Sequence, residues 1–299
     1  MALARRPLTP ATMRTLLLLC GLAATGLAAE PVFTPLLDEK LSQWEKWLGV
    51  PHRAHEVPGY VRGATPKEDP VLGLNRDPLG VYTAKLVDGE PVLHITGQVF
   101  GGLTSLKSYD NFHLRTQQRW GTRKWEPRLN AVRDNGILIY CVGEHGAGGK
   151  NWMRSQECQV QEGDIGDWWP IAGTIVDIPI RAEGRSLSYD PKAPLRTMTG
   201  RAFHGTDYQE KPSGEWNVIE VYSLNGNAVF RLNGRTVNVI LNSRIREKGS
   251  DQDIPLKAGK LQIQSEAAEC EYRRLEIRPL TAWPQEVAGD LPAIPPQAK

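Results

Sequence analysis

The chain has 299 residues, and its 36 basic and 34 acidic residues leave a formal net charge of only +2 at pH 7. Because neither sign forms a long block, the sequence argues against nucleic acid as a partner. After the N-terminal segment, no run is long and apolar enough to predict a membrane-spanning helix.

The first 29 residues have the layout of a cleaved secretory signal. Three arginines precede the apolar run Leu16–Leu27, and two alanines follow it. The run is short for a bilayer span, so we expect export to the periplasm or out of the cell. Lipid attachment at Cys20 is the weaker alternative, because Leu19 stands where a lipoprotein signal has a small residue.

Residues 30–282 are expected to form one domain, because the roughly 270 residues after the signal fit within a single all-β sandwich. The first part contains a weakly amphipathic segment at Leu36–Leu48, with apolar residues roughly at helical spacing. Pro51–Pro78 is rich in proline, glycine and charge and predicts a long loop, a kind that often covers a site. The Pro-rich end, residues 283–299, is expected to be a disordered tail.

Short strands separated by turn signals fill most of the remaining chain. Asn233-Gly234 predicts a tight hairpin, because both positions of a type I′ turn require positive φ. Many short strands without a convincing long helix predict an all-β fold, an antiparallel β-sandwich or jelly roll. Residues 183–213 form a long insertion. The predicted strands are 80–86, 92–96, 101–105, 112–120, 136–142, 155–161, 174–180, 216–223, 228–232, 235–240, 261–265 and 272–277.

Three cysteines, Cys141, Cys158 and Cys270, follow the signal, an odd number that cannot form a complete disulfide framework. Cys141 and Cys158 lie in two neighbouring predicted strands, where they either pair with each other or stay buried as free thiols. All three lie in apolar strands, and their spacing matches no zinc motif.

Residue types that do chemistry are concentrated between Arg133 and Pro170. Side chains alternate between the two faces of a strand, so Glu157, Gln159 and Gln161 share one face of the predicted strand 155–161. A carboxylate and two amides in a row suit a polyhydroxylated ligand, because amides both donate and accept hydrogen bonds. The alternative is an ordinary solvent-facing surface.

Tryptophan outnumbers phenylalanine in the chain, nine to five, and Trp152, Trp168 and Trp169 lie in this stretch. A flat indole covers the apolar face of a sugar ring while its N–H stays available, so we count all three as candidate binding residues. Core packing is the alternative for each. At most one of the adjacent pair Trp168-Trp169 faces inward if the backbone is extended, so the other lies at a surface or cleft.

A Gly-rich loop carries His145 and Lys150, and its glycines allow a ligand to approach the backbone closely. His145 is either a catalytic residue or an incidental loop histidine. The loop is not a nucleotide motif, because the required glycine spacing is absent. His204, in the 183–213 insertion, is a second candidate binding residue, with a plain loop role as the alternative.

The acidic residues Glu162, Asp164 and Asp167 follow the predicted strand 155–161. Together with Asp134 and loop carbonyls, they would suit a hard divalent cation such as calcium. No other cofactor is indicated.

Glycosidases commonly use two carboxylates, and Glu157 and Glu162 are the obvious pair in this stretch. Spacing along one strand does not determine how far apart the two groups lie. The chain has no local Ser/His/Asp signature, so covalent acyl chemistry has no support.

Five sequence blocks resemble, in order, those of the 3-keto-disaccharide hydrolase domain family. They are KSYDNFHLRTQQRWG, RDNGILIYCVG, SQECQVQEGD, GEWNVIEVYSLNGNAVFRLNG and GKLQIQSEAAECEYRRLEIRPL. The resemblance extends over about 36–280, and Asn135-Gly136 and Glu157-Cys158-Gln159 match the family's short motifs. The loop GEHGAGGKNWM and the turn EGDIGDWW look like features of a subgroup.

The resemblance implies a concanavalin A-like jelly roll, often exported by bacteria, that cleaves glycosides whose sugar is oxidised at C3. A ketone at C3 acidifies the C2 hydrogen, so a base can remove it and the group at C1 leaves by β-elimination. Water then adds back to give net hydrolysis, or the unsaturated sugar is released. On this basis we predict His145 as the base and Glu157 as the acid or as the partner on the enolate side, with Arg128 or a cation stabilising the oxyanion.

The remaining candidates, Asp134, Gln159, Gln161, Lys150, Trp152, Trp168, Trp169 and His204, are predicted to bind the carbohydrate. The alternatives are a non-catalytic glycan-binding module and a conventional glycoside hydrolase, since the fold supports all three. The sequence does not indicate an oligomeric state.

Overall fold

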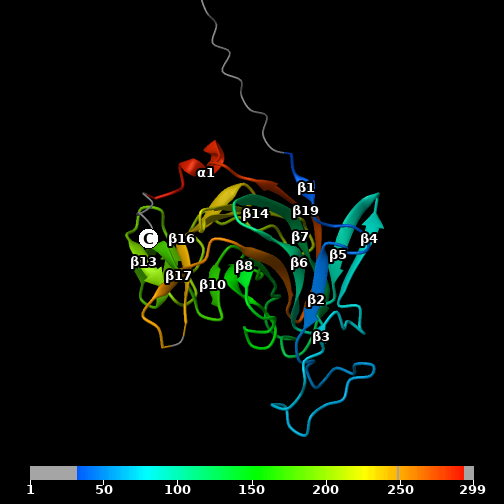
Figure 1. Cartoon of the computed structure of the whole chain (residues 1–299). Coiled ribbons are helices and arrows are strands. Elements are labelled where there is room, and N and C mark those ends of the chain that lie inside the picture. The colour runs from blue at the N-terminus through cyan, green and yellow to red at the C-terminus, as the bar shows by residue number, and fades with distance from the viewer. Residues whose placement is uncertain (1–31, 248, 293–299) are drawn as a thin grey trace, which may run out of the picture. The chain divides into compact units, whose positions relative to one another are not determined.

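Two antiparallel sheets account for most of the regular structure in the computed structural model, which describes residues 32–247 and 249–292. The larger sheet has twelve strands and the smaller has seven, and Figure 1 shows them stacked as two layers. The predicted antiparallel β-sandwich is therefore confirmed. The predicted signal at residues 1–29 lies outside the described residues, so export remains a prediction.

The larger sheet runs in the order β12-β11-β16-β15-β14-β7-β19-β5-β4, with β1, β13 and β17 paired to β19, β11 and β16. Its strands are β1 (Thr34–Pro35), β4 (Tyr82–Val87), β5 (Glu90–Ile95), β7 (Phe112–Lys124), β11 (Thr174–Glu183), β12 (Ser186–Tyr189), β13 (Leu195–Met198), β14 (Asn217–Leu224), β15 (Asn227–Leu232), β16 (Arg235–Arg246), β17 (Asp253–Pro255) and β19 (Ala268–Pro279).

The smaller sheet runs in the order β10-β9-β8-β18-β6-β2-β3. Its strands are β2 (Trp44–Leu48), β3 (Gly73–Leu74), β6 (Gly101–Tyr109), β8 (Gly136–Val142), β9 (Arg154–Gln159), β10 (Trp168–Ile171) and β18 (Gly259–Ser265). One large cluster of buried apolar side chains fills the space between the two sheets. Successive side chains of a strand point to opposite faces, so those that do not point into this cluster lie on the outer face of their sheet.

The segment predicted as amphipathic contains a strand, β2, rather than a helix. Trp44 and Leu48 are both buried there. Two apolar residues four positions apart share one face of a helix and also one face of a strand, so their spacing alone does not distinguish the two. β2 pairs with β6 along its whole length, and this pairing stabilises the strand conformation.

A bulge in β8 explains why Cys141 and Cys158 are both buried free thiols. Tyr140 has a positive φ of 56°, and both Ile139 and Tyr140 face the core between the sheets. The next residue, Cys141, is thereby turned to the outer face, where it packs in a small separate apolar cluster. Cys158 faces the core from β9. The two thiols point to opposite faces of the sheet and therefore do not pair.

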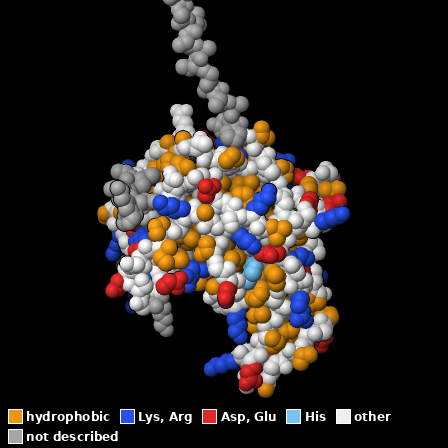
Figure 2. Space-filling view, viewed as in Figure 1, with side chains coloured by type: hydrophobic (Ala, Val, Ile, Leu, Met, Phe, Trp, Pro, Cys, Tyr) orange, Lys and Arg blue, Asp and Glu red, His pale blue; other side chains and the backbone are white. Residues whose placement is uncertain are grey.

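The predicted loop Pro51–Pro78 contains only the two-residue strand β3. Residues 51–72, called the lobe here, extend away from the sandwich at the β2–β3 edge of the smaller sheet (Figure 1). Figure 2 shows that the surface is hollowed between the lobe and the rest of the sandwich. The buried Asp69 stabilises the lobe by accepting two 2.9 Å hydrogen bonds from Arg53 and one of 2.9 Å from the Gly63 N–H.

The start of the predicted tail is packed on the sandwich rather than loose. It contains a short helix, α1 (Gln285–Ala288), whose Val287 is fully buried in the main core cluster. The Thr236 hydroxyl donates a 2.5 Å hydrogen bond to Asp290. The expectation of a disordered tail therefore fails for residues 283–292, because Val287 supplies an apolar anchor, and residues 293–299 lie outside the described part. No helix among the described residues has the length and apolar character needed to cross a membrane.

We expect Val287→Ala to lower the free energy of unfolding by about 2 kcal/mol, because it removes two buried methyl groups from the core. Val61→Ala in the lobe is the matched control, since Val61 is 81% exposed and its truncation removes no buried contact. Urea unfolding of both variants measures the difference. Equal destabilisation would show that α1 does not contribute to the stability of the sandwich.

Candidate functional site

The outer face of the smaller sheet carries two matching rows of polar side chains. β9 presents Glu157 and Gln159, and β18 presents Gln262 and Gln264, with β8 lying between them. All four side chains are buried. A carboxyl and three amides therefore lie close together at one place on this face.

Gly136 in β8 allows the two rows to meet. A Cβ atom at this position would overlap the Glu157 carboxyl and would come within 2.7 Å of Gln264 Oε1. The preceding residue, Asn135, anchors the start of β8, because its amide donates to the Gln264 carbonyl at 2.6 Å and accepts from the Tyr272 hydroxyl at 2.6 Å. Tyr272 lies in β19 of the other sheet, so the Asn135-Gly136 pair ties this site to both layers.

Three carboxyl groups, those of Asp134, Glu157 and Glu266, form the centre of the site and are called the carboxyl cluster here. Asp134 and Glu266 face each other in an antiparallel bridge just beyond β8 and β18. Arg128 lies within 2.6 Å of Asp134 and 3.2 Å of Glu266. One guanidinium group thus forms ion pairs with two carboxyl groups.

The surroundings favour the protonated forms of all three groups. Burial raises the pKa of Glu157 well above its ordinary value, and the charges of Glu266 and Asp134 raise it further. Burial also raises the pKa of Asp134, against the opposing effect of Arg128. For Glu266, burial and then the charge of Asp134 raise the pKa. The cluster therefore retains protons at neutral pH, and the tighter contact with Arg128 makes Asp134 the member that ionises more readily.

A second arginine, Arg201, approaches from the 183–213 insertion. Its Nε donates a 2.6 Å hydrogen bond to the fully buried Asp167, and its Nη2 lies 2.8 Å from Asp164. The guanidinium also lies over the Trp169 ring, 5.4 Å from its centroid. Its charge lowers the pKa of Glu157, so its field extends to the carboxyl cluster.

Several buried polar atoms at the site have no hydrogen-bond partner among the described residues. They are Gln159 Oε1, Gln264 Oε1 and Arg128 Nε. Buried groups of this kind are usually satisfied, and each unpaired one is costly. Two acceptors and one donor are thus left unpaired and shielded from solvent at the site.

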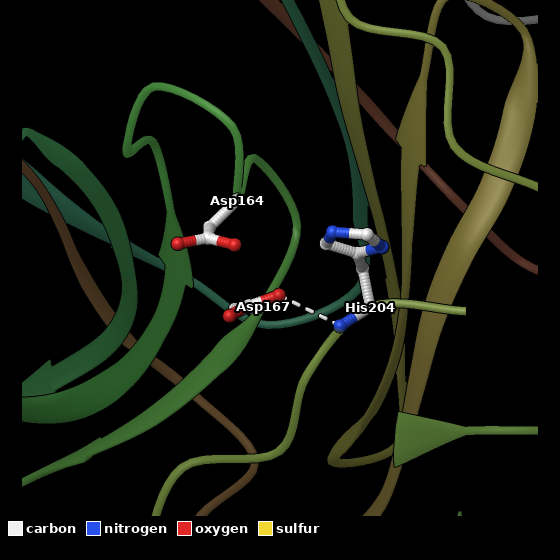
Figure 3. Close-up of side chains that lie close together, drawn as sticks. All are labelled: Asp164, Asp167 and His204. Carbon is white, nitrogen blue, oxygen red and sulfur yellow. Dashed lines mark hydrogen bonds between the residues drawn. The ribbon is translucent and has the colours of Figure 1, made fainter. Parts of the chain in front are cut away.

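The predicted calcium ligands are only partly brought together. Figure 3 shows Asp164, Asp167 and His204 converging, with ligand atoms within 4.8 Å of one another. Arg201 binds both carboxylates, however, so a divalent ion would have to displace the guanidinium. Glu162 turns away and accepts a 2.9 Å hydrogen bond from Arg133. Arg201 therefore places a positive charge where the sequence predicts a divalent cation.

His204 has a structural setting. Its main-chain N–H donates to Asp167 at 2.7 Å, its Nδ1 lies 2.8 Å from the Gly205 carbonyl, and its ring stacks on Tyr208. Gln161 donates a 2.5 Å hydrogen bond to Asp164 and lies 3.4 Å from Arg128. Gln161 thus connects the two arginine centres, whereas His204 orients Asp167.

The three candidate tryptophans have different surroundings. Trp168 faces the core, where its Nε1 donates to Gln156 at 2.8 Å, so it is a core residue rather than a binding residue. Trp169 pairs in register with Glu157 and is 36% exposed on the outer face. The prediction that only one of this pair faces inward is confirmed. Trp152 donates to the Gly101 carbonyl at 3.1 Å and stacks on Phe100.

The structure does not bring His145 to Glu157. His145 Nε2 lies 3.2 Å from Glu45 Oε1, and the ring stacks on Trp47, both residues of β2. Three strands separate β2 from β9, which places their backbones roughly 19 Å apart at the usual spacing of strands. Lys150 is exposed and donates to the Lys67 carbonyl of the lobe at 3.4 Å. The histidine and the predicted acid therefore belong to separate hydrogen-bond networks.

The sequence reasoning missed Glu266, Gln264 and Arg201. A signal for the first two was present, because Gln262, Gln264 and Glu266 alternate in the same way as Glu157, Gln159 and Gln161. No local pattern marks Arg201, which lies in a loop far along the chain. Only the folded arrangement places it beside Asp164 and Asp167.

Glu157→Gln is expected to make stability less dependent on pH. The folded state raises the pKa of Glu157 above its ordinary value of 4.5, so this group's contribution to stability is complete below that value. The contribution is lost as pH rises through the folded pKa. Chemical denaturation should show that E157Q gains stability relative to the wild type as pH rises above about 5.

The control for this measurement is Glu144→Gln, which changes an exposed carboxylate in the loop after β8. Its stability should follow that of the wild type across the same range. Parallel curves for E157Q and the wild type would contradict a raised pKa at Glu157.

A family model described as a 3-keto-alpha-glucoside-1,2-lyase-like domain matches residues 32–278. A solved candidate glycosyl hydrolase from Parabacteroides distasonis is 16% identical, with coverage of 83% of this chain and 100% of that chain and a TM-score of 0.45. A Bacillus licheniformis β-glucanase is 8% identical, with coverage of 85% and 99% and a TM-score of 0.39.

A carbohydrate-binding module of Bacillus subtilis, CBM66, is 8% identical, with coverage of 65% of this chain and 93% of that chain and a TM-score of 0.37. No curated protein matches the chain. The family match includes every residue of the carboxyl cluster and both arginines, and it confirms the resemblance seen in the sequence. Because this match extends over most of the chain, the protein belongs to the 3-keto-alpha-glucoside-1,2-lyase-like domain family.

Proposed function

We propose that this protein cleaves the glycosidic bond of 3-keto-glycosides by β-elimination. The observation that carries the proposal is the buried carboxyl cluster, in which groups that retain protons lie beside a carboxylate paired with Arg128. Elimination needs an acid, a base and stabilisation of a developing negative charge. The cluster and its two arginines offer all three within one site.

Glu157 is suited to the role of general acid. Its raised pKa keeps the carboxyl protonated at neutral pH, so it has a proton to give to the oxygen that leaves C1. Its hydrogen bond with Gln264 and the space above Gly136 hold the group in one position. The leaving group departs as a neutral alcohol.

Asp134 is the group that we assign as base. Its contact with Arg128 favours the ionised form more than the surroundings of Glu266 do, so Asp134 is the carboxylate available to take the C2 hydrogen. Electrons from the broken C–H bond then form the enolate at C3, and the C1–O bond breaks. His145, the base predicted from the sequence, is bound to Glu45 instead.

Positive charge at the site distinguishes elimination from ordinary glycoside hydrolysis. An ordinary glycosidase passes through an oxocarbenium-like transition state, which carries positive charge. Arg128 and Arg201 would destabilise that state, whereas they would stabilise an enolate oxygen. The same electrostatics therefore favour a 3-keto sugar over its unoxidised parent. Addition of water to the unsaturated product would complete a net hydrolysis.

Recognition of the sugar ring is assigned to the groups left without partners. Gln159 Oε1 and Gln264 Oε1 can accept hydrogen bonds from sugar hydroxyls. Trp169, 36% exposed and in register with Glu157, offers a flat apolar surface beside the acid. These contacts would hold C1 and C2 near the carboxyl cluster.

The purified protein should release the alcohol from a 3-keto-glucoside but not from the unoxidised glucoside. E157Q should reduce the release rate by about 10²- to 10⁴-fold, the range expected when a general acid is lost. Chromatography of the released alcohol, together with absorbance of the unsaturated sugar, measures both.

The control is E144Q, which should match the wild type. Full activity of folded E157Q would refute the role of the acid. Release from the unoxidised glucoside at an equal rate would favour an ordinary glycosidase. Binding of the sugar without any release would favour a glycan-binding module.

Gly136→Ala is expected to displace the Glu157 carboxyl and lower the release rate by about 10²-fold, the cost of moving a catalytic group by about an ångström. Gly200→Ala is the matched control, because a Cβ at Gly200 meets no atom within 4 Å. Circular dichroism of both variants verifies the fold. If G136A and G200A were equally active, the position of Glu157 above Gly136 would have no importance for catalysis.

A further inference from the structure

Arg201 lies in a connecting segment, where no regular element fixes its position. Residues 199–216 are all described, and they connect β13 to β14 without a helix or strand. Beside Arg201, the main chain is attached to β10 by an isolated bridge: the Ala202 N–H donates to the Trp168 carbonyl at 3.0 Å, and the reverse hydrogen bond is 2.8 Å long. The guanidinium itself is held by two carboxylates of residues 161–167, called the acidic turn here. The position of this charge therefore depends on the position of the acidic turn.

The far end of the same segment holds the acidic turn through two side chains, those of Tyr208 and Glu210. Glu210 Oε2 accepts a 2.7 Å hydrogen bond from the Gly163 N–H. The Tyr208 hydroxyl accepts a 3.0 Å hydrogen bond from the Ile165 N–H and donates one to Glu210. Gly163 and Ile165 flank Asp164 in the sequence. The two side chains thus fix the main chain on both sides of a carboxylate that binds the arginine.

The main chain on either side of Glu210 is itself attached to the larger sheet. The Gln209 carbonyl accepts a 2.7 Å hydrogen bond from Asn233, in the turn between β15 and β16. The Lys211 N–H donates to Asn217 of β14 at 2.9 Å, and Asn233 donates to the same oxygen at 2.9 Å. Glu210 therefore connects the acidic turn, which lies between two strands of the smaller sheet, to a fixed place on the larger sheet.

His204 connects the two ends of the segment. Its main-chain N–H donates to Asp167 at 2.7 Å, and its ring stacks on Tyr208 with 3.9 Å between ring centroids. Figure 3 shows the histidine facing both carboxylates of the acidic turn. A shift of this turn would move Asp164 and Asp167 together, and with them the guanidinium of Arg201.

We propose that Tyr208 and Glu210 are positioning residues that hold Arg201 in place for catalysis. The inference rests on the proposed function, in which Arg201 helps to stabilise the enolate. Neither residue has to touch the sugar, because both act on the turn that binds the guanidinium. A fixed charge stabilises a transition state best when it is already in place. A looser turn should therefore slow the chemical step more than it weakens substrate binding.

Tyr208→Phe and Glu210→Ala should each lower kcat on a 3-keto-glucoside by about 10- to 100-fold, with KM nearly unchanged. Glu210→Gln should retain more activity than E210A, because its side-chain carbonyl can still accept the hydrogen bond from Gly163. Tyr189→Phe is the matched control, because this tyrosine of the same insertion donates instead to the Asp290 carbonyl, at 3.4 Å. Y189F should keep the wild-type kcat, and circular dichroism of all four variants verifies the fold.

The pH profile of kcat distinguishes positioning from a general loss of stability. Burial raises the pKa of Glu157 and of Asp134, and the charge of Arg201 opposes this effect at both groups. Displacement of Arg201 should therefore raise both pKa values and move the profile of Y208F and E210A to higher pH. A variant that is only less stable would keep the wild-type profile.

A double-mutant cycle with Arg201→Gln tests whether the effect passes through the arginine. Without a charge to position, E210A should lower kcat by no more than about 2-fold in the R201Q background. An equal loss in both backgrounds, or a wild-type kcat and pH profile in folded Y208F and E210A, would overturn the positioning role and leave the proposed function standing. A wild type that is inactive on the 3-keto-glucoside would overturn the proposed function, and the positioning role with it.

Discussion

Burial of three carboxyl groups beside one another is the constraint on which the rest of the site depends. An isolated buried carboxylate is costly, and several together repel one another. Two features reduce the cost of burying these carboxyl groups: protons are retained on Glu157 and Glu266, and Arg128 lies against Asp134. Both features suit catalysis, because a retained proton can be donated and a fixed positive charge can stabilise an enolate. The groups that make burial tolerable are therefore the ones suited to elimination.

The two sheets hold the carboxyl cluster in position. Gly136 has no side chain, and Glu157 and Gln264 occupy the space that one would fill. Asn135 connects β8 to β18 and, through Tyr272, to the opposite sheet. Packing of the sandwich core is thereby coupled to the position of the acid. Such rigid support is what a catalytic group requires, since small displacements have large effects on rate.

The loops around the smaller sheet complete the site and differ in their charge. The insertion that carries Arg201 adds a cation beside Asp164 and Asp167. The lobe instead pairs its charges internally, with Asp69 bound by Arg53 and Arg62. Arg128 directs positive charge to the carboxyl cluster.

The sequence by itself determined the all-β class, most strand positions and one row of the site. Alternation along a strand is a local property, so Glu157, Gln159 and Gln161 could be placed on one face from their spacing alone. The same reasoning predicted that Trp168 and Trp169 point to opposite sides, as they do. It failed at β2, where the spacing of Trp44 and Leu48 fits a helix and a strand equally well.

Only the tertiary structure decided which residues meet. Glu266 and Arg201 lie far from Glu157 along the chain, and no local pattern encodes the pairing of β8 with β18 or the position of the insertion. His145 lies near Glu157 in sequence yet contacts Glu45, because the loop after β8 reaches across the sheet to β2. Strand order and loop direction are set by long-range packing, which sequence spacing does not record. The row of candidate groups can thus be predicted from local sequence spacing, whereas the site forms only when the chain is folded.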